Sequence, residues 1–296
     1  MVSETVGMIG LGVLGSAIVP NLIRRGFPVV GYDIDHAKAE GLADEGMIVA
    51  GSIHDVAARA EVVITCLPSV ASLHAVVAGD GGLVTFDRPG QIVVEISTLP
   101  VIEKERARDA LAAVGKTMVD CPVSGNRIVA LRGGLTAFAS GERAACARIE
   151  PVLLGFCRKT TYVGPFGCGM KMKLVGNLLN LVHNCAAAEA MVLGMKSGLD
   201  PTLIHEAISG SGSSSSMFEV RGALMAANDY RKGELNFSVP LKDARIISEH
   251  AASVLCPLPI YQVALQQYYA AVAQGHFDED HAAVCAAMER AANCER

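Results

Sequence analysis

The sequence predicts an α/β protein in which an N-terminal doubly wound domain is followed by an all-α domain. The first half of the chain alternates short β-branched runs with stretches of helical apolar spacing, the pattern of a parallel sheet covered on both faces. The second half has long helical stretches and no strand signal after Gly167. We therefore expect a doubly wound domain at residues 1–165 and an all-α domain at 166–296, with the boundary in the turn Val163–Gly167.

Each strand expected in the first half is a short apolar run bounded by turn residues. The runs are VGMIG (6–10), FPVVGYD (27–33), AEVVITCLP (60–68), GQIVVEIST (90–98) and GKTMVDCPVS (115–124), with further strands near LTAFASG (135–141) and KTTYVG (159–164). The segments 16–26 and 99–115 between them carry apolar residues at helical spacing. This alternation is that of a doubly wound sheet.

The second half opens with a long apolar helix, expected from Met170 to about Gly198. Shorter helices are expected at Pro201–Ser209, 217–227, 242–253 and 259–274. The Ser/Gly stretch 210–216 fits either a loop near the cleft or a flexible linker, and the sequence leaves both interpretations open.

Composition narrows the classes of partner. The 296 residues are 51% hydrophobic and 19% charged, and their net charge of −5 offers no basic patch, so neither nucleic acid nor an anionic membrane is expected as a partner. No run of 18 apolar residues lacks a polar interruption, and the first motif begins at residue 6, so we expect no membrane span, no targeting peptide and a cytoplasmic protein. The nine cysteines include no CxxC pair, which favours reduced, buried thiols and no metal site.

A glycine-rich turn follows the first expected strand. Gly10 allows a tight turn, Gly12 lets the backbone approach a pyrophosphate, and Gly15 permits close packing of the next helix. The second strand ends in Asp33, 18 residues after Gly15, where a carboxylate binds ribose hydroxyls and repels the 2′-phosphate of NADP. No Arg or Lys directly follows Asp33, so the pattern predicts a Rossmann domain that binds NAD in preference to NADP. The predicted cofactor-binding residues of this segment are Gly10, Gly12, Val13, Leu14, Gly15 and Asp33.

The long helix of the second half carries a narrow polar stripe. At about 100° per residue, Lys173, Asn177, Asn180 and Asn184 fall within about 60° of one another. One interpretation is that these side chains are satisfied against another domain. The other is a catalytic lysine with amide donors beside it, because desolvation and a nearby nicotinamide cation favour the neutral amine that a general base needs. His183 lies off the stripe, and we expect it to be structural.

A second candidate is the segment Val123–Asn126, after the strand that ends near Asp120. Its hydroxyl and consecutive amides suit a carboxylate ligand, although an ordinary turn would have the same residues. No GxSxG motif surrounds Ser124, so a serine hydrolase is not expected.

Several segments together resemble the β-hydroxyacid dehydrogenase family, in the family's order. They are IGLGVLGSAIVPNLIRRGFPVVGYD, EISTLP, DCPVSGN followed by GGLTAFASG, GCGMKMKLVGN and, more weakly, PLKDARI. The tail, with SSMFEVRGALMAANDY and CPLPIYQVALQQYYAAVAQGHFDEDHAAV, is similar to L-threonate dehydrogenase-like members. The matches run from residue 6 to about 250, nearly the whole chain.

The resemblance implies a role for each matched residue. Lys173 would be the general acid and base, and Asn177 would hold it and the substrate hydroxyl. Ser124, Gly125 and Asn126 would bind the substrate carboxylate. The remaining assignments are Leu67, Pro68, Thr98 and Lys242 at the cofactor and Asp243 at the substrate.

The chain departs from the family pattern in four segments. Val13–Leu14 stand where members often have a Met before the third glycine. Asn126 replaces a common Gly, Gly176 replaces an Asn, and Phe237 is the nearest aromatic residue upstream of PLKDARI. Most of these changes surround the expected substrate, so they affect its identity more than the reaction type.

The resemblance predicts hydride transfer between NAD and a small hydroxy acid, with a sugar acid such as threonate as one expected substrate. The alternatives are a semialdehyde reductase, an imine reductase and a non-catalytic dinucleotide-binding scaffold. Imine reductases and scaffolds of this fold generally lack the lysine that this chain has at position 173. The apolar helical domain predicts a homodimer or homotetramer.

Overall fold

The computed structural model describes residues 4–231 and 235–296. The chain divides into two compact units, Met1–Lys173 (unit 1) and Leu174–Arg296 (unit 2). The division falls within the long helix α8, and each unit is described by itself.

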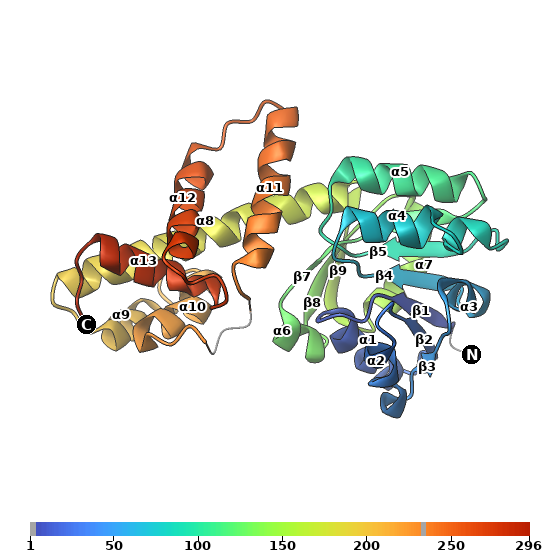
Figure 1. Cartoon of the computed structure of the whole chain (residues 1–296), viewed down its shortest axis with the longest axis horizontal. Coiled ribbons are helices and arrows are strands. Elements are labelled where there is room, and N and C mark those ends of the chain that lie inside the picture. The colour runs from blue at the N-terminus through green and yellow to red at the C-terminus, as the bar shows by residue number, and fades with distance from the viewer. Residues whose placement is uncertain (1–3, 232–234) are drawn as a thin grey trace. The chain divides into compact units, whose positions relative to one another are not determined.

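Unit 1 is built on a nine-stranded sheet (Figure 1). Six strands in the order β3-β2-β1-β4-β5-β6 are parallel throughout, which confirms the predicted doubly wound arrangement. These strands are β1 (Val6–Ile9), β2 (Val29–Tyr32), β3 (Ile48–Val49), β4 (Val62–Thr65), β5 (Ile92–Glu95) and β6 (Thr117–Asp120).

The remaining strands extend the sheet beyond β6 with a change of direction. They are β7 (Val123–Ser124), β8 (Leu135–Ser140) and β9 (Cys157–Gly164). β8 is antiparallel to both β6 and β7 and parallel to β9. β6 and β7, which are separated by two residues of the chain, therefore both run in the direction opposite to β8.

Helices cover both faces of this sheet. Alternate strand residues enter two separate cores: Val62 and Ile64 lie in one, whereas Val63 lies in the other. The helices of unit 1 are α1 (Gly15–Arg24), α2 (His36–Glu40), α3 (Ile53–Arg59), α4 (Val70–Ala78), α5 (Val101–Ala112), α6 (Arg127–Leu131) and α7 (Arg143–Leu153), with 3₁₀ turns η1 (Ala43–Glu45) and η2 (Leu83–Thr85).

Unit 2 is helical, as predicted. Its helices are α8 (Cys168–Lys196, which starts in unit 1), α9 (Pro201–Ile208), α10 (Ser216–Ala227), α11 (Ser238–Ser253), α12 (Pro259–Ala273) and α13 (Val284–Ala291), with the 3₁₀ turn η3 (His281–Ala283). Asp200 and Ser215 cap α9 and α10 by accepting bonds from backbone amides three residues later. The stretch before Ser215 is a loop, and α13 is a helix that the apolar spacing did not predict.

Among the described residues, α8 is the one helix long and apolar enough to cross a membrane, with 29 residues and a mean hydropathy of 1.3 over an 18-residue stretch. The central helix of a soluble protein meets the same criterion. Side-chain bonds from Asn184 to Tyr268 and from Cys185 to the carbonyl oxygen of Ala264 join α8 to α12. These bonds make α8 a core helix of unit 2.

Candidate active site

The glycine turn after β1 is shaped by its lack of side chains. Gly10 has a φ of +95°, and a Cβ at this position would overlap the carbonyl oxygen of Cys66. A Cβ at Gly15 would overlap the carbonyl oxygen of Gly10. A Cβ at Gly12, in contrast, would meet no atom within 4 Å. The turn therefore holds α1 tightly against β1 and leaves open space at Gly12, an arrangement that fits the pyrophosphate of a dinucleotide at a helix N-terminus.

Asp33, directly after β2, is bound to this turn. It is 8% exposed, and its Oδ2 accepts a hydrogen bond of 2.7 Å from the Leu11 amide while Oδ1 accepts one of 2.9 Å from the Asp35 amide. Lys38 Nζ lies 3.7 Å from Asp33 Oδ1. The carboxylate is thus fixed beside the glycine turn. Lys38 is a cation that the sequence analysis missed, because α2 brings it back toward a residue five positions earlier.

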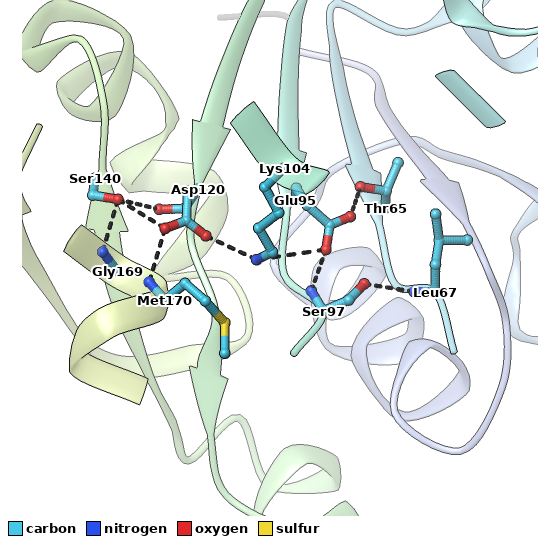
Figure 2. Close-up of polar contacts among 9 residues, drawn as sticks. All are labelled: Thr65, Leu67, Glu95, Ser97, Lys104, Asp120, Ser140, Gly169 and Met170. Atoms are coloured by element: carbon cyan, nitrogen blue, oxygen red, sulfur yellow. Dashed lines mark hydrogen bonds and ion pairs between the residues drawn. The ribbon is translucent and has the colours of Figure 1, made fainter. Parts of the chain in front are cut away.

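The turns after β4 and β5 are joined by side chains that the sequence analysis also missed (Figure 2). The Leu67 amide donates to Ser97 Oγ at 2.7 Å, and the Ser97 amide donates to Glu95 Oε1 at 2.6 Å. Thr65 Oγ1 donates to the other oxygen of Glu95. Pro68 and Thr98, which were predicted to lie at the cofactor, directly follow Leu67 and Ser97, so this network fixes the turns that carry them.

The Ser124 segment joins β7, whose last residue is Ser124, to α6. Gly125 has a φ of +136°, and a Cβ there would press against the side chains of Leu135 and Val129, so the turn requires glycine. Asn126 caps α6, because its Oδ1 accepts a hydrogen bond of 3.0 Å from the Val129 amide. Ser124 is half-buried at the end of this rigid turn, where its hydroxyl can donate to an anionic ligand.

Helix α8 begins at the carboxyl end of β6. The Gly169 amide donates to Ser140 Oγ at 2.8 Å and the Met170 amide donates to Asp120 Oδ2 at 2.8 Å. Lys173 follows within the next turn and is half-buried. The helix that carries the predicted catalytic lysine is therefore anchored to the same edge of the sheet as the glycine turn.

In unit 2, the predicted residues Asn177, Lys242 and Asp243 come together. Asn177 Nδ2 donates to Asp243 Oδ2 at 2.7 Å, and Lys242 Nζ lies 3.1 Å from Asp243 Oδ1. Asp243 is 7% exposed. Asn177 lies one helical turn after Lys173 on α8, so Asp243 orients an amide that neighbours the lysine along the helix.

One part of the predicted polar stripe has a structural role instead. Asn184 is fully buried and donates to Tyr268 Oη at 2.8 Å and to the carbonyl oxygen of His281 at 3.0 Å. The interpretation of Asn184 as a donor beside the lysine was wrong, because helical periodicity does not show what packs against a face. Asn180 is exposed.

The thiols are poor nucleophiles where they are buried. Burial raises the pKa of Cys157 to about 12 and that of Cys146 to about 11, so both stay protonated near neutral pH. Within residues 4–231 and 235–296, no group of three or more His, Cys, Asp or Glu side chains could hold a metal ion.

Comparison with known families covers both units. Residues 5–164 match the family described as the NAD binding domain of 6-phosphogluconate dehydrogenase. Residues 167–288 match the family described as NAD-binding of NADP-dependent 3-hydroxyisobutyrate dehydrogenase. Together these matches span nearly the whole chain and agree with the order of motifs along it.

Individual relatives agree with these matches. The L-threonate dehydrogenase of Cupriavidus necator is 33% identical over 283 residues, covering 95% of each chain. The mitochondrial 3-hydroxyisobutyrate dehydrogenase of Rattus norvegicus is 31% identical over 96% of this chain and 87% of its own. The crystal structure of a 3-hydroxyisobutyrate dehydrogenase from Salmonella typhimurium superposes with a TM-score of 0.85, covering 96% of this chain and 99% of that one at 28% identity.

An imine reductase from Pseudomonas sp. shares the fold alone, with 18% identity and a TM-score of 0.56. The dinucleotide turn, the anchored lysine helix and the matches along both units agree with one another. The chain belongs to the β-hydroxyacid dehydrogenase family and is an oxidoreductase that uses a nicotinamide dinucleotide.

Proposed function

We propose that this chain interconverts a small hydroxy acid and its carbonyl product, with Lys173 as the general acid and base. The observation that carries the proposal is the anchored start of α8. These bonds start the helix that carries Lys173 at the carboxyl edge of the sheet, where the glycine turn also lies. An amine at this edge can both accept and release a proton, as a general acid and base must.

Each remaining residue has a distinct task in this proposal. Ser124, Gly125 and Asn126 bind the substrate carboxylate through a hydroxyl and amide groups held by a rigid turn. Asn177, oriented by Asp243, holds the lysine amine and the substrate hydroxyl. A nicotinamide dinucleotide would supply hydride transfer when bound, and these residues would supply orientation and proton transfer.

We propose NAD as the preferred dinucleotide. The fixed carboxylate of Asp33 can accept hydrogen bonds from both ribose hydroxyls and would repel a 2′-phosphate. Lys38 acts in the opposite direction, but it already pairs with Asp33 and Asp35. Gly10, Gly12, Val13, Leu14 and Gly15 would hold the pyrophosphate, with Leu67, Pro68, Thr98 and Lys242 around the rest of the cofactor.

For the substrate we propose a sugar acid such as threonate. Two L-threonate dehydrogenases, from Cupriavidus necator and Haemophilus influenzae, are 33% and 30% identical to this chain over most of its length. The experiment is a panel of hydroxy acids that includes threonate and 3-hydroxyisobutyrate, assayed with NAD and NADP by the absorbance of the reduced cofactor. Turnover of threonate or another sugar acid with NAD supports the proposal, and turnover of 3-hydroxyisobutyrate alone would overturn the choice of substrate. Reduction of imines with no turnover of any hydroxy acid would overturn it.

We further propose a cytoplasmic homo-oligomer, a dimer or tetramer. Unit 2 exposes large apolar side chains on α8 and α12, including Leu193 and Ile260 at 71% each and Val263 at 67%. Such exposure is more typical of an interface than of a monomer surface. Light scattering during gel filtration would measure the mass in solution, and a mass of one chain at micromolar concentration would contradict the proposal.

A further inference from the structure

A buried ionic network adjoins the anchored start of α8 (Figure 2). Lys104, on α5, donates to Asp120 Oδ1 at 2.8 Å, and its Nζ lies 3.7 Å from Glu95 Oε1. The ammonium and both carboxylates are 0% exposed. Burying three charged groups is costly, and apolar side chains of similar volume would often stabilise a fold as well or better. Such a network therefore calls for an explanation other than stability.

The network ends on two different parts of the site. On one side, Asp120 and Ser140 bind the first backbone amides of α8. On the other side, Glu95 accepts from the Ser97 amide, and Ser97 accepts from the Leu67 amide. Lys104 lies between the two carboxylates, so one ammonium joins the start of the lysine helix to the turns after β4 and β5.

The start of α8 depends on these side chains because its amides have no earlier turn to bind to. The first amides of a helix lack partners within the helix and carry a partial positive charge. Here Asp120 supplies a full negative charge to that end, and Lys104 compensates the same carboxylate from the other side. A Cβ on Gly169 would overlap the carbonyl oxygen of Phe138, so the helix approaches the sheet as closely as its backbone permits. The position of Lys173, one turn later, follows from this contact.

We propose that Lys104, Asp120 and Ser140 are positioning residues, which hold the first turn of α8 and thereby set the position of the Lys173 amine relative to the turns that carry Leu67 and Thr98. The catalytic part of this proposal rests on the proposed function of Lys173. The anchoring part concerns the backbone of α8 alone and can be measured in the absence of turnover.

The test compares the two buried lysines of unit 1. Lys104→Met removes the ammonium at the carboxyl ends of the strands. Lys116→Met removes a buried lysine at their amino ends, where Lys116 is 2% exposed and bonds to Leu83 and Gln91. Ser140→Ala is the milder variant, because it removes one hydroxyl and no charge. If Lys104→Met does not fold, Ser140→Ala tests whether these side chains hold the start of α8. The readouts are hydrogen exchange of the amides of Gly169 and Met170, kcat per folded molecule, NADH affinity and melting temperature.

We expect Lys104→Met and Ser140→Ala to speed hydrogen exchange at the amides of Gly169 and Met170 by about tenfold or more. Each variant removes or loosens a side chain that accepts a hydrogen bond from these amides. We expect kcat to fall about 10- to 100-fold, the loss that follows a displacement of about 1 Å at a catalytic group. Lys116→Met should lower the melting temperature and leave kcat and amide exchange at the start of α8 near the wild-type values. Unchanged exchange at the start of α8 in both carboxyl-end variants would overturn the proposal, and so would an equal loss of kcat in Lys116→Met. If the wild type turns over no hydroxy acid, the proposed function fails, and the exchange measurement alone decides the anchoring.

Discussion

At the amino ends of β5 and β6, Lys116 donates to the carbonyl oxygen of Leu83 at 2.6 Å and to Gln91 Oε1 at 2.9 Å. At the carboxyl ends of the same two strands, Lys104 binds Asp120 and Glu95. Both lysines are buried, but the groups that they bind connect to different parts of unit 1. Lys116 donates to a backbone carbonyl and to Gln91, and Gln91 itself donates to two further backbone carbonyls. The two carboxylates that Lys104 binds accept hydrogen bonds from backbone amides at the start of α8 and in the turn after β5.

The comparison assigns different roles to the two edges of the sheet in unit 1: stability of the fold at the amino edge and function at the carboxyl edge. Polar groups at the amino edge of the sheet are satisfied by the fold itself, so changes there should alter the free energy of unfolding and leave turnover intact. Polar groups at the carboxyl edge hold the segments that would contact cofactor and substrate, as is general for open α/β sheets. Changes there should alter turnover or specificity even where the fold survives.

The largest effect is expected at Lys173. Lys173→Met keeps the aliphatic stem and helix propensity but removes the amine, and loss of acid–base assistance lowers kcat by about 10²–10⁴-fold. Lys171→Met, an exposed lysine two residues earlier on α8, is the matched control. Measuring kcat, NADH affinity and melting temperature on one preparation checks the prediction. A folded Lys173→Met protein that keeps more than about a tenth of wild-type kcat would contradict it.

The next effect concerns the choice of cofactor at Asp33. Ile34 is 88% exposed, so Asp33→Ser with Ile34→Arg should fold, remove the repulsion of a 2′-phosphate and supply a cation for it. We expect the preference for NADP over NAD, as a ratio of kcat/KM, to rise about 10- to 100-fold, since bonds to charged groups are worth roughly 1.5–3 kcal/mol. Ile34→Arg alone shows how much the cation contributes. The assignment is wrong if the wild type already uses NADP better than NAD.

A smaller effect is expected at the Ser124 turn. Ser124→Ala should raise the KM of the carboxylate substrate about tenfold, the value of one hydrogen bond to a charged group, with NADH affinity unchanged. Steady-state kinetics with NADH titration by fluorescence separates the two quantities. An equal loss of NADH affinity would show that the turn serves the cofactor or the fold.

The amino edge should give no effect on turnover. Gln91→Leu removes one of the two partners of Lys116 and two hydrogen bonds to backbone carbonyls, leaving buried polar groups unsatisfied at a cost of about 2 kcal/mol. The melting temperature should fall while kcat per folded molecule stays within about twofold of the wild type, because the bonds lost all lie within the fold. A loss of kcat as large as that of Ser140→Ala would remove the distinction between the two edges.

Sequence reasoning predicted the parts of the candidate site whose local structure depends on neighbouring residues. The glycine turn, Asp33 and the extent of α8 were predictable because tight turns and helical spacing depend on residues that are close together in the sequence. Lys38 was missed because a bend of the chain brings it back toward Asp33. The bonds of Asp120 could not be predicted, because they join residues up to 50 positions apart in sequence.

The polar stripe on α8 shows the same limit. Lys173 and Asn177 share a helix face with Asn184, and periodicity alone treats all three alike. Packing separates them: Asn177 binds Asp243, whereas Asn184 is buried against Tyr268 and His281. The partners of a helix face are set by tertiary contacts, so only the structure could distinguish an amide near the lysine from one in the core of unit 2.

The most direct test of the central claim, that the Lys173 amine exchanges the substrate proton, is the pH dependence of kcat for hydroxy acid oxidation. It is measured with saturating NAD in the wild type and in Lys173→Met. A general base must be unprotonated to accept a proton, so wild-type kcat should fall about tenfold per pH unit on the acid side of the titration of the amine. The residual activity of Lys173→Met should lack this acid limb. The same acid limb at the same pH in both proteins would contradict the account, because the proton would then be taken by another group.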